Sequence, residues 1–375
     1  MFVEQRCWTH DSGWTIVRPS PVPIQPHLVL YFGSADLGDA AVALRDFYPN
    51  APLLGCSTAG EICETRVSEG TVVATALQFE RTTVRTAHRV IVNRHESASI
   101  GRRLASDLDP EGLVHVFALA EGLNVNGSEL VKGLRDGLPS SVAVTGGLAG
   151  DGERFQRTVV SLDDKDGDGG VAIVGFYGDL RIGYGSMGGW DQFGPERLVT
   201  RSEGNVLYEL DGASALELYK SYLGPYASEL PASGLLFPLS LRMESEHTSV
   251  VRTILGIDEK EGSLTFAGDV PQGAYTRLMK ANVDRLIDGA HGAAGASYEA
   301  VGSSTPDVAL LISCVGRKLV LKQRVEEEIE SVREVLGEHP VLAGFYSYGE
   351  IAPFAPSVKC ELHNQTMTIT TLSER

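Results

Sequence analysis

One pattern occurs three times along the sequence, and this repetition constrains the fold more strongly than any other feature. Each copy has an apolar run, a segment with helical spacing, a proline, a second apolar run and a Gly-acid dipeptide. The copies begin with HLVLYFG, LVHVFAL and DVALLISCV, and they end with LLGCSTAGE, VAVTGGLAGD and VLAGFYSYGE. Two short β-type runs joined by a helix predict a βαβ unit with parallel strands and a right-handed crossover.

The segments between the copies show the alternation of half-buried antiparallel strands, as in GTVVATALQF and TMTITTL. Helical spacing predicts further helices at about 203–224 and 275–297, on either side of a hairpin at 249–268. We therefore expect an α/β fold with α+β character, built from repeated βαβ units with mixed sheets and antiparallel additions. The sequence pattern changes near residue 200, and this change predicts two related domains, residues 1–200 and 201–375.

The charge and composition exclude several classes of partner. The net charge is −17 over 375 residues, which argues against nucleic acid and against an anionic membrane surface, because both are bound through Lys and Arg. No apolar run has the length of a signal peptide or a membrane span. The five cysteines are scattered without CxxC spacing, so we expect neither a metal site nor a disulfide framework, and a cytoplasmic location.

The three Gly-acid dipeptides are the strongest candidates for a binding site. Glu61, Asp151 and Glu350 each follow a glycine just beyond the carboxyl end of a predicted strand. Ligands of open α/β sheets bind at such ends, so the three acids could face one pocket. The alternative is that each glycine permits a turn and each acid caps the next element.

Other side chains near these turns complete the candidate pocket. The residues just before the dipeptides are small, hydroxylated or aromatic, and the candidates among them are Cys56, Ser57, Thr58, Gly147, Tyr346 and Tyr348. Arg317, at the end of a predicted strand, either meets a ligand carboxylate or pairs with an acid of the next helix, such as Glu326. His363 lies on a predicted strand, where it either contacts the ligand or makes a structural hydrogen bond.

A catalytic nucleophile is the competing hypothesis for the first turn. GCSTA is close to the G-x-S-x-G turn of serine hydrolases, but Ala59 replaces the second glycine and no helix pattern follows. Cys56 could instead act with His363 as its base, although no sequence feature places the two together. A small buried cysteine explains the pattern more simply, so we expect no enzyme activity.

Taken together, the motifs GCSTAGEI, GGLAGD, GNVLYELDG, SCVGR, GFYSYGEI and LHNQTM resemble those of FIST proteins, which carry FIST N and FIST C domains. The resemblance covers nearly the whole chain from about residue 28. It implies a sensory module of signal transduction that binds a small molecule such as an amino acid, and we expect this sensor to be non-enzymatic. From the chemistry of the side chains, we expect Arg317 to hold a ligand carboxylate, the acids to hold an ammonium or hydroxyl group, and the tyrosines to form the walls of the pocket.

The resemblance also implies how such a sensor signals. FIST proteins occur fused to, or encoded beside, histidine kinases, chemoreceptors and cyclic-di-nucleotide enzymes. This chain has no segment that reads as an output domain, so a stand-alone cytoplasmic sensor acting through a partner such as a histidine kinase or chemoreceptor is expected. No cofactor is expected, but a subset of the family binds haem and senses nitric oxide through a kinase, which leaves haem as the alternative.

Overall fold

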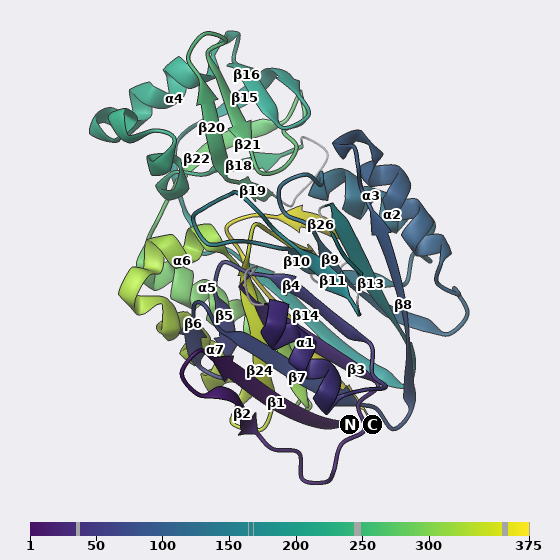
Figure 1. Ribbon diagram of the computed structural model, residues 1–375. Coiled ribbons are helices and arrows are strands. Elements are labelled where there is room, and N and C mark those ends of the chain that lie inside the picture. Colours follow the sequence, from purple (N-terminus) through teal and green to yellow (C-terminus); the bar gives the residue numbers. More distant parts are fainter. Residues whose placement is uncertain (35–37, 164, 168, 244–248, 355–358, 375) are drawn as a thin grey trace.

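The structure is a computed structural model that describes residues 1–34, 38–163, 165–167, 169–243, 249–354 and 359–374. Within these residues the chain forms three sheets that enclose a common interior, and a fourth sheet in a separate lobe (Figure 1). No helix in the described part is long and apolar enough to cross a membrane. The predicted mixed α/β architecture is confirmed.

Each of the three central sheets is built around one copy of the sequence repeat. In spatial order, the first contains β2 (Gly13–Arg18), β1 (Phe2–Thr9), β7 (Val72–Gln78), β3 (Leu28–Gly33), β4 (Leu53–Ser57), β11 (Val160–Leu162) and β12 (Lys165–Gly167). The second contains β8 (Thr82–Val90), β13 (Gly170–Gly178), β9 (Leu113–Ala120), β10 (Ala143–Leu148), β25 (Gly349–Pro353) and β26 (Cys360–His363). The third contains β14 (Leu180–Met187), β27 (Met367–Glu374), β23 (Val308–Cys314), β24 (Val341–Ser347), β5 (Glu61–Cys63) and β6 (Arg66–Ser68).

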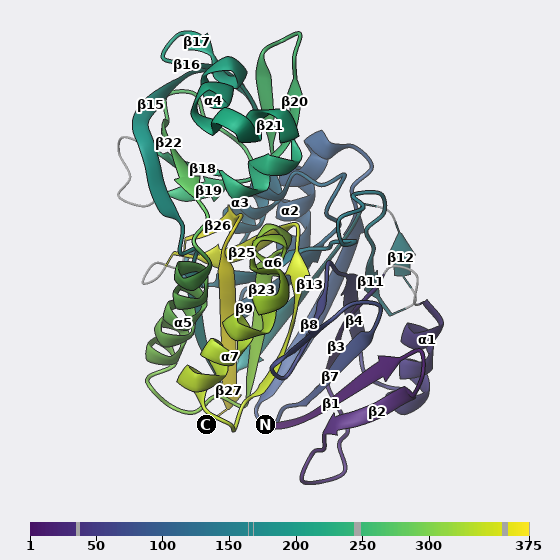
Figure 2. The same ribbon diagram turned by 90° about the vertical axis from the view of Figure 1, so that its left-hand side faces the viewer.

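The predicted βαβ units form the centre of each sheet. The pairs β3–β4, β9–β10 and β23–β24 are parallel, and the other neighbours are antiparallel. The crossovers contain α1 (Gly38–Phe47) in the first unit, α3 (Gly127–Gly137) in the second, and α6 (Val315–Leu321) with α7 (Val325–Leu336) in the third. Two more helices, α2 (Ser97–Ser106) and α5 (Val283–Ala300), lie on the outer faces beside α3 and α7 (Figure 2).

The sheets are joined by an exchange of hairpins. After its second parallel strand, each repeat sends a short hairpin into the sheet of another repeat. Hairpin β5–β6 of the first repeat joins the third sheet, β25–β26 of the third joins the second, and β11–β12 of the second joins the first. These three hairpins therefore link the three sheets into a closed ring.

The inner faces of the sheets meet in one apolar core. One phenylalanine from each repeat lies at its centre, namely Phe32, Phe117 and Phe345. The ring centroids of Phe32 and Phe345 are 4.8 Å apart. Strands buried on both faces explain why the repeat begins with continuous apolar runs rather than with an alternating pattern.

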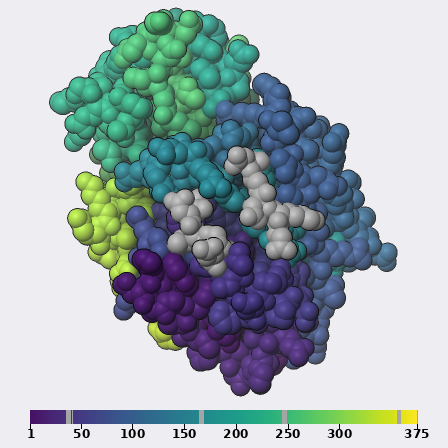
Figure 3. Space-filling model, in the orientation of Figure 1, coloured from purple at the N-terminus to yellow at the C-terminus, as the bar shows by residue number. Residues whose placement is uncertain are grey.

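A separate lobe, residues 191–280, is inserted between β14 and α5 and is called the inserted lobe below. Its elements are β15 (Asp191–Glu203), β16 (Val206–Leu210), β17 (Ala213–Ser214), α4 (Ala215–Leu223), β18 (Leu239–Arg242), β19 (Val250–Arg252), β20 (Ile254–Asp258), β21 (Ser263–Phe266) and β22 (Tyr275–Lys280). It has its own apolar core and stands beside the main body as a rounded projection (Figure 3).

The lobe is where sequence-based prediction of elements is partly wrong. The predicted hairpin is confirmed by β20 and β21. Of the helix expected at 203–224 only α4 is helical, because Val206–Leu210 pairs with β15 and β21 as a strand. The turn after it, Asp211-Gly212, has φ of 51° and 80°, the hairpin conformation that Asp-Gly favours. The helix expected at 275–297 likewise begins only at Val283, after strand β22 and the N-cap Asn282.

The expected domain boundary after residue 200 falls within β15. The second and third sheets each combine strands from both sides of this position. In the folded chain, the sequence halves 1–200 and 201–375 therefore share hydrogen-bonded sheets.

Candidate ligand-binding site

The three Gly-acid turns lie at the carboxyl ends of β4, β10 and β24, where each repeat leaves its own sheet to enter another. Glu61 opens β5 and Glu350 lies in β25, so both are inside hairpins that cross between sheets. Asp151 stands in the loop between β10 and β11. All three side chains are buried.

Glu61 and Glu350 are held by the same arrangement of donors. Each accepts from a hydroxyl three residues earlier, Thr58 at 2.5 Å and Ser347 at 2.8 Å respectively. The other carboxylate oxygen accepts from the backbone N–H and the hydroxyl of a threonine that precedes the next long strand. For both acids these distances are 3.2 and 2.8 Å, from Thr71 to Glu61 and from Thr366 to Glu350.

Burial has the largest effect on the pKa of these two glutamates. It raises the pKa of both carboxyl groups, and the hydroxyl and backbone donors offset only part of the effect. The pKa of Glu350, which is fully enclosed, reaches about 8. At neutral pH Glu350 is therefore mainly protonated.

Asp151 has a different environment. Its oxygens accept from the backbone N–H groups of Phe155, Gln156 and Arg157, each at 2.9 Å, and from the hydroxyl of Tyr348. Burial alone would raise the pKa of this carboxyl group, but the backbone N–H of Arg157, the Tyr348 hydroxyl and the other two N–H groups together lower it. Asp151 is thus an ionised anchor for the loop that follows.

A cleft of about 630 Å³ opens between the first two turns and helix α6 of the third repeat. It is called the charged cleft below. Its polar and charged lining residues are Ser34, Thr58, Glu61, Glu69, Asp151, Glu153, Arg154, Lys318 and Lys322. The three repeats therefore build one cavity at their strand ends, with groups of both charges on its walls.

Lys318 reaches from α6 into the first turn. Its Nζ donates to the carbonyl oxygen of Ala59 at 2.6 Å and pairs with the carboxylate of Glu69. The neighbouring Gly60 has φ of 145°, and a Cβ there would lie 3.0 Å from the Lys318 Nζ. A glycine at this position thus permits both the backbone turn and the approach of the lysine.

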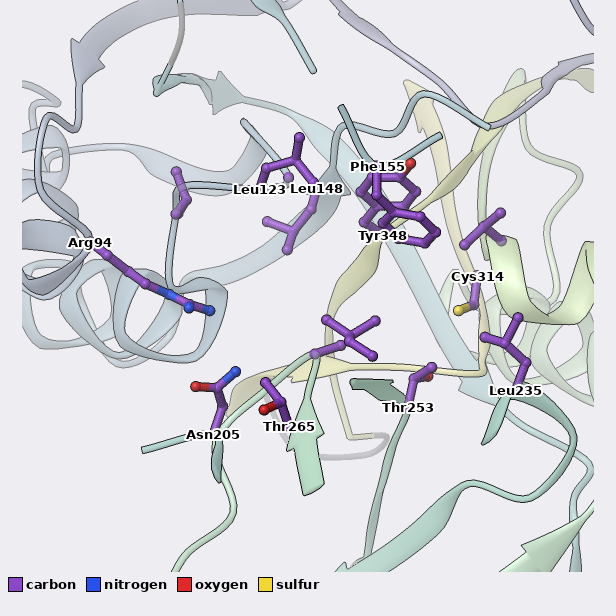
Figure 4. A pocket seen from close by; sticks show the side chains of 15 residues that line it. Arg94, Leu123, Leu148, Phe155, Asn205, Leu235, Thr253, Thr265, Cys314 and Tyr348 are labelled. Atoms are coloured by element: carbon purple, nitrogen blue, oxygen red, sulfur yellow. The ribbon is translucent and has the colours of Figure 1, made fainter. Parts of the chain in front are cut away.

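A second, smaller cavity of about 150 Å³ lies between the main body and the inserted lobe, and is called the interface pocket below (Figure 4). The main body contributes Leu148 and Tyr348, among others, and the lobe contributes Thr253 and Leu255. The ring of Tyr348 stacks on that of Phe155 with centroids 4.5 Å apart. In contrast to the charged cleft, most of this wall is apolar.

Comparison with known proteins agrees with the sequence motifs. The FIST N domain profile matches residues 27–213, and the FIST C domain profile matches residues 215–353. The chain belongs to the FIST family. FIST domains are associated with sensory and signal-transduction roles and with small-ligand binding.

Other comparisons add little about this FIST protein. No curated protein matches it. A solved structure described as cyanuric acid hydrolase from A. caulinodans is 10% identical over 78% of this chain and 99% of that chain, with a TM-score of 0.19. A likeness this weak supports no argument about mechanism.

The structure of this FIST protein places the eleven predicted site residues in three environments. Thr58, Glu61 and Asp151 line the charged cleft, and Tyr348 lines the interface pocket. The remaining seven line neither of these two cavities and are buried in the protein, namely Cys56, Ser57, Gly147, Arg317, Tyr346, Glu350 and His363.

Arg317 takes the second of its two predicted roles, with a different acid. It is fully buried, and its guanidinium donates to Glu328 of α7 at 2.7 Å rather than to Glu326. Further bonds go to the carbonyl oxygens of Gly188 and of Leu286, which flank the inserted lobe on its two sides in sequence. Arg317 therefore fixes the base of the lobe instead of meeting a ligand in either cavity.

The other buried candidates have internal partners. The Tyr346 hydroxyl donates to Glu328 at 2.5 Å, and the Ser57 hydroxyl accepts from the Val159 N–H at 2.9 Å. The imidazole of His363 contacts the carbonyl oxygen of Ala352 at 3.0 Å, and burial lowers its pKa to about 4. Cys56 belongs to the central apolar core, where burial raises the pKa of its thiol.

Several lining residues escaped sequence analysis. Lys318 directly follows Arg317. Because both residues lie in helix α6, their side chains point in different directions, and only Lys318 lines the charged cleft. Arg94 of the short 3-10 helix η1 (Arg94–Glu96) and Thr253 of the lobe meet at the interface pocket from positions far apart in sequence. A usable signal exists for η1, since Asn93 and Glu96 form a capping box.

Proposed function

We propose that this FIST protein is a sensor of a small zwitterion, such as an amino acid, that binds in the charged cleft and controls a signalling partner. The partner would be a histidine kinase or a chemoreceptor, and the location cytoplasmic, which fits five free cysteines. The observation that carries the proposal is that three repeats converge on one cleft with both signs of charge on its walls.

The lining of the charged cleft suits an ammonium and a carboxylate on one molecule. An ammonium has three donors, and Lys318 uses two of them on Ala59 and Glu69. The third can bond a ligand carboxylate, supported by Lys322 nearby. Glu69 and Glu153 offer carboxylates for the ligand ammonium. A volume of about 630 Å³ accommodates such a ligand.

The environment of the first turn supports a role in binding without catalysis. Cys56 is 5% exposed in the core, and its raised pKa leaves little thiolate, the form that acts as a nucleophile. Ser57 is 3% exposed, and its hydroxyl accepts a hydrogen bond from the Val159 N–H. His363 and its partner Ala352 lie in the second sheet, whereas Cys56 and Ser57 lie in the first, so His363 does not serve either residue as a base.

The residues present do not fit the haem alternative. Of the nine histidines, His247 lies outside the described residues, and none of the others lines either of the two cavities. Cys314 and Tyr348 in the interface pocket are residue types that can bind haem iron. Their cavity of about 150 Å³ equals one that holds a single benzene ring, which is much smaller than a porphyrin.

A thermal-shift screen with amino acids tests the proposed function. At 100 times its Kd, a ligand that binds only the folded chain adds about 2.7 kcal/mol to the free energy of unfolding. We expect one or more amino acids to raise the Tm of the parent, and the substitution Lys318→Met to remove most of that rise.

Lys132→Met is the matched control, because Lys132 also pairs with a glutamate but lies on α3 away from the cleft. Circular dichroism of both variants checks that they fold. A panel without any effect on the parent would refute the proposed ligand class. An unchanged response of Lys318→Met would refute the charged cleft as the site.

A further inference from the structure

The interface pocket differs from the charged cleft in its position, size and chemistry. Its walls come from two bodies, the central sheets and the inserted lobe, and polar contacts join these two bodies. Arg252 Nη1 of the lobe donates to the Leu362 carbonyl oxygen at 2.9 Å, and Asn126 Nδ2 of the body donates to Asp269 Oδ1 at 3.1 Å. A molecule in this pocket would touch both bodies.

One side of the pocket is an aromatic and aliphatic wall. Phe155 and Tyr348 stack with an interplanar angle of 13°, and Leu123 and Leu148 continue the surface (Figure 4). Phe155 has φ of 51°, a conformation that bulky residues rarely adopt and that tends to occur at functional sites. Its N–H bond to Asp151 holds it there. The cavity of about 150 Å³ matches one that binds benzene.

The lobe side of the pocket carries an unpaired polar group. Thr253 is 4% exposed, and its Oγ1 has no hydrogen-bond partner among the described residues. Gly316, which follows the lining residues Cys314 and Val315 in sequence, packs against the Gln365 carboxamide, and both polar atoms of that group also have no partner among the described residues. Buried polar groups nearly always have a partner, so an unpaired hydroxyl on a residue of the pocket wall favours a ligand with a polar substituent.

A cationic group stands at the rim of the pocket. Arg94 is exposed, and no hydrogen bond or ion pair joins its guanidinium to the rest of the described chain. Figure 4 shows its side chain extending toward the space between Leu123 and Asn205. The capping box around η1 fixes the backbone from which Arg94 extends. A guanidinium in this position can bind a carboxylate through two hydrogen bonds.

We propose that the interface pocket is a second binding site, for a small aromatic monocarboxylate of about one ring. The carboxylate pairs with Arg94 at the rim, and the ring lies against Phe155 and Tyr348. Thr253 Oγ1 bonds a hydroxyl substituent on the ring. Because the ligand contacts both the body and the lobe, its binding favours the arrangement in which the two are closed on each other.

Calorimetric titration of the full chain with benzoate, benzamide and the three hydroxybenzoates tests this site. We expect benzoate to bind more tightly than benzamide, which lacks the charge. Arg94→Gln should weaken benzoate ~10-fold and leave benzamide unchanged, because only benzoate makes the charge-assisted bond. One hydroxybenzoate should bind ~3- to 10-fold more tightly than benzoate, and Thr253→Val should remove this preference.

Three further variants assign the binding to the pocket. Arg103→Gln, which changes an exposed arginine of α2, is the matched control and should bind benzoate as the parent does. Ala267→Leu, which extends a lining side chain into the cavity, should block benzoate and benzamide alike. Lys318→Met should leave benzoate binding intact, which separates this site from the charged cleft. Thermal unfolding of each variant confirms that it is folded.

The proposal has clear opposing outcomes. It is wrong if benzoate does not bind, if Arg94→Gln binds benzoate like the parent, or if Ala267→Leu has no effect. Loss of benzoate binding in Lys318→Met would move the site to the charged cleft. An absence of amino-acid binding in the thermal-shift screen, with benzoate binding intact, would refute the proposed function and leave this second site standing.

Discussion

The first and third Gly-acid turns differ from the second in the kind of donor that holds the acid. Glu61 and Glu350 face hydroxyl groups together with one backbone N–H each, whereas Asp151 faces three backbone N–H groups and a tyrosine hydroxyl. A hydroxyl can donate or accept, but a backbone N–H can only donate. The first environment therefore tolerates a neutral side chain and the second requires an anion.

The sequence explains this difference. Three residues before the acid, the first and third repeats have Thr58 and Ser347, whereas the second has Leu148. The threonine that precedes the next long strand, Thr71 or Thr366, is also replaced, by Gly169. The second repeat thus lacks both hydroxyls, and its shorter aspartate turns instead to the loop that positions Phe155.

Asp151→Asn should have the largest effect of the three changes that test this comparison. One amide oxygen cannot satisfy three N–H donors, and the new NH₂ group must face at least one of them. Since hydrogen bonds to a charged group contribute about 1.5–3 kcal/mol each, we expect a loss of about 3 kcal/mol in the free energy of unfolding by urea at pH 7. Glu350→Gln, by contrast, should cost less than about 1 kcal/mol, and equal losses would contradict the distinction.

The pH dependence of stability should reveal Glu350. Its pKa is raised from 4.5 to about 8 on folding, so the folded state binds the extra proton and stability falls as pH rises through 8. From pH 6.5 to 9 the expected loss is roughly 2 kcal/mol. His363, with a pKa of about 4, stays neutral throughout this range.

Urea unfolding of parent and Glu350→Gln across this pH range isolates the contribution, because all other groups are common to both. The variant should lack the part of the slope that Glu350 supplies. Glu330→Gln, on the exposed face of α7, should retain the parental slope. Parallel profiles for the parent and Glu350→Gln would show that Glu350 is ionised in the folded state.

Tyr348→Phe should cost much less stability than Asp151→Asn. It removes the hydroxyl that donates to Asp151 but keeps the ring that stacks on Phe155. Three backbone donors still hold the aspartate, so we expect a loss of about 1 kcal/mol in the free energy of unfolding. Benzoate binding should persist, and its disappearance would mean that the hydroxyl, rather than the ring, is used by the ligand.

The fold was predictable to the extent that local periodicity determines it. The apolar runs and helical spacing identified all three βαβ units, because both faces of those strands are buried. The exchange of hairpins was not predictable, because pairing between Phe345 and Glu61 joins residues that are distant in sequence. Val206–Leu210 was misassigned because five residues fit either period, and the Asp-Gly turn after them was the deciding signal.

The candidate site was predictable only in its location. Strand-end reasoning placed Thr58, Glu61 and Asp151 around a cavity, which the structure has as the charged cleft. It could not tell which neighbours point inward, since Arg317 is enclosed with Glu328 while the adjacent Lys318 reaches the cleft. It also could not foresee the interface pocket, whose two walls are brought together by the insertion of the lobe.

The hairpin exchange has a consequence for folding. Strand β27 is the last strand in chain order, yet it lies inside the third sheet between β14 and β23. Hairpins β5–β6 and β25–β26 likewise pair with strands that are far away along the chain. Such non-local pairing gives a high contact order, so folding is slow and can be completed only after the strands of all three repeats have been synthesised. Each half of the chain on its own would have unpaired sheet edges, and these edges are covered only when the other half is present.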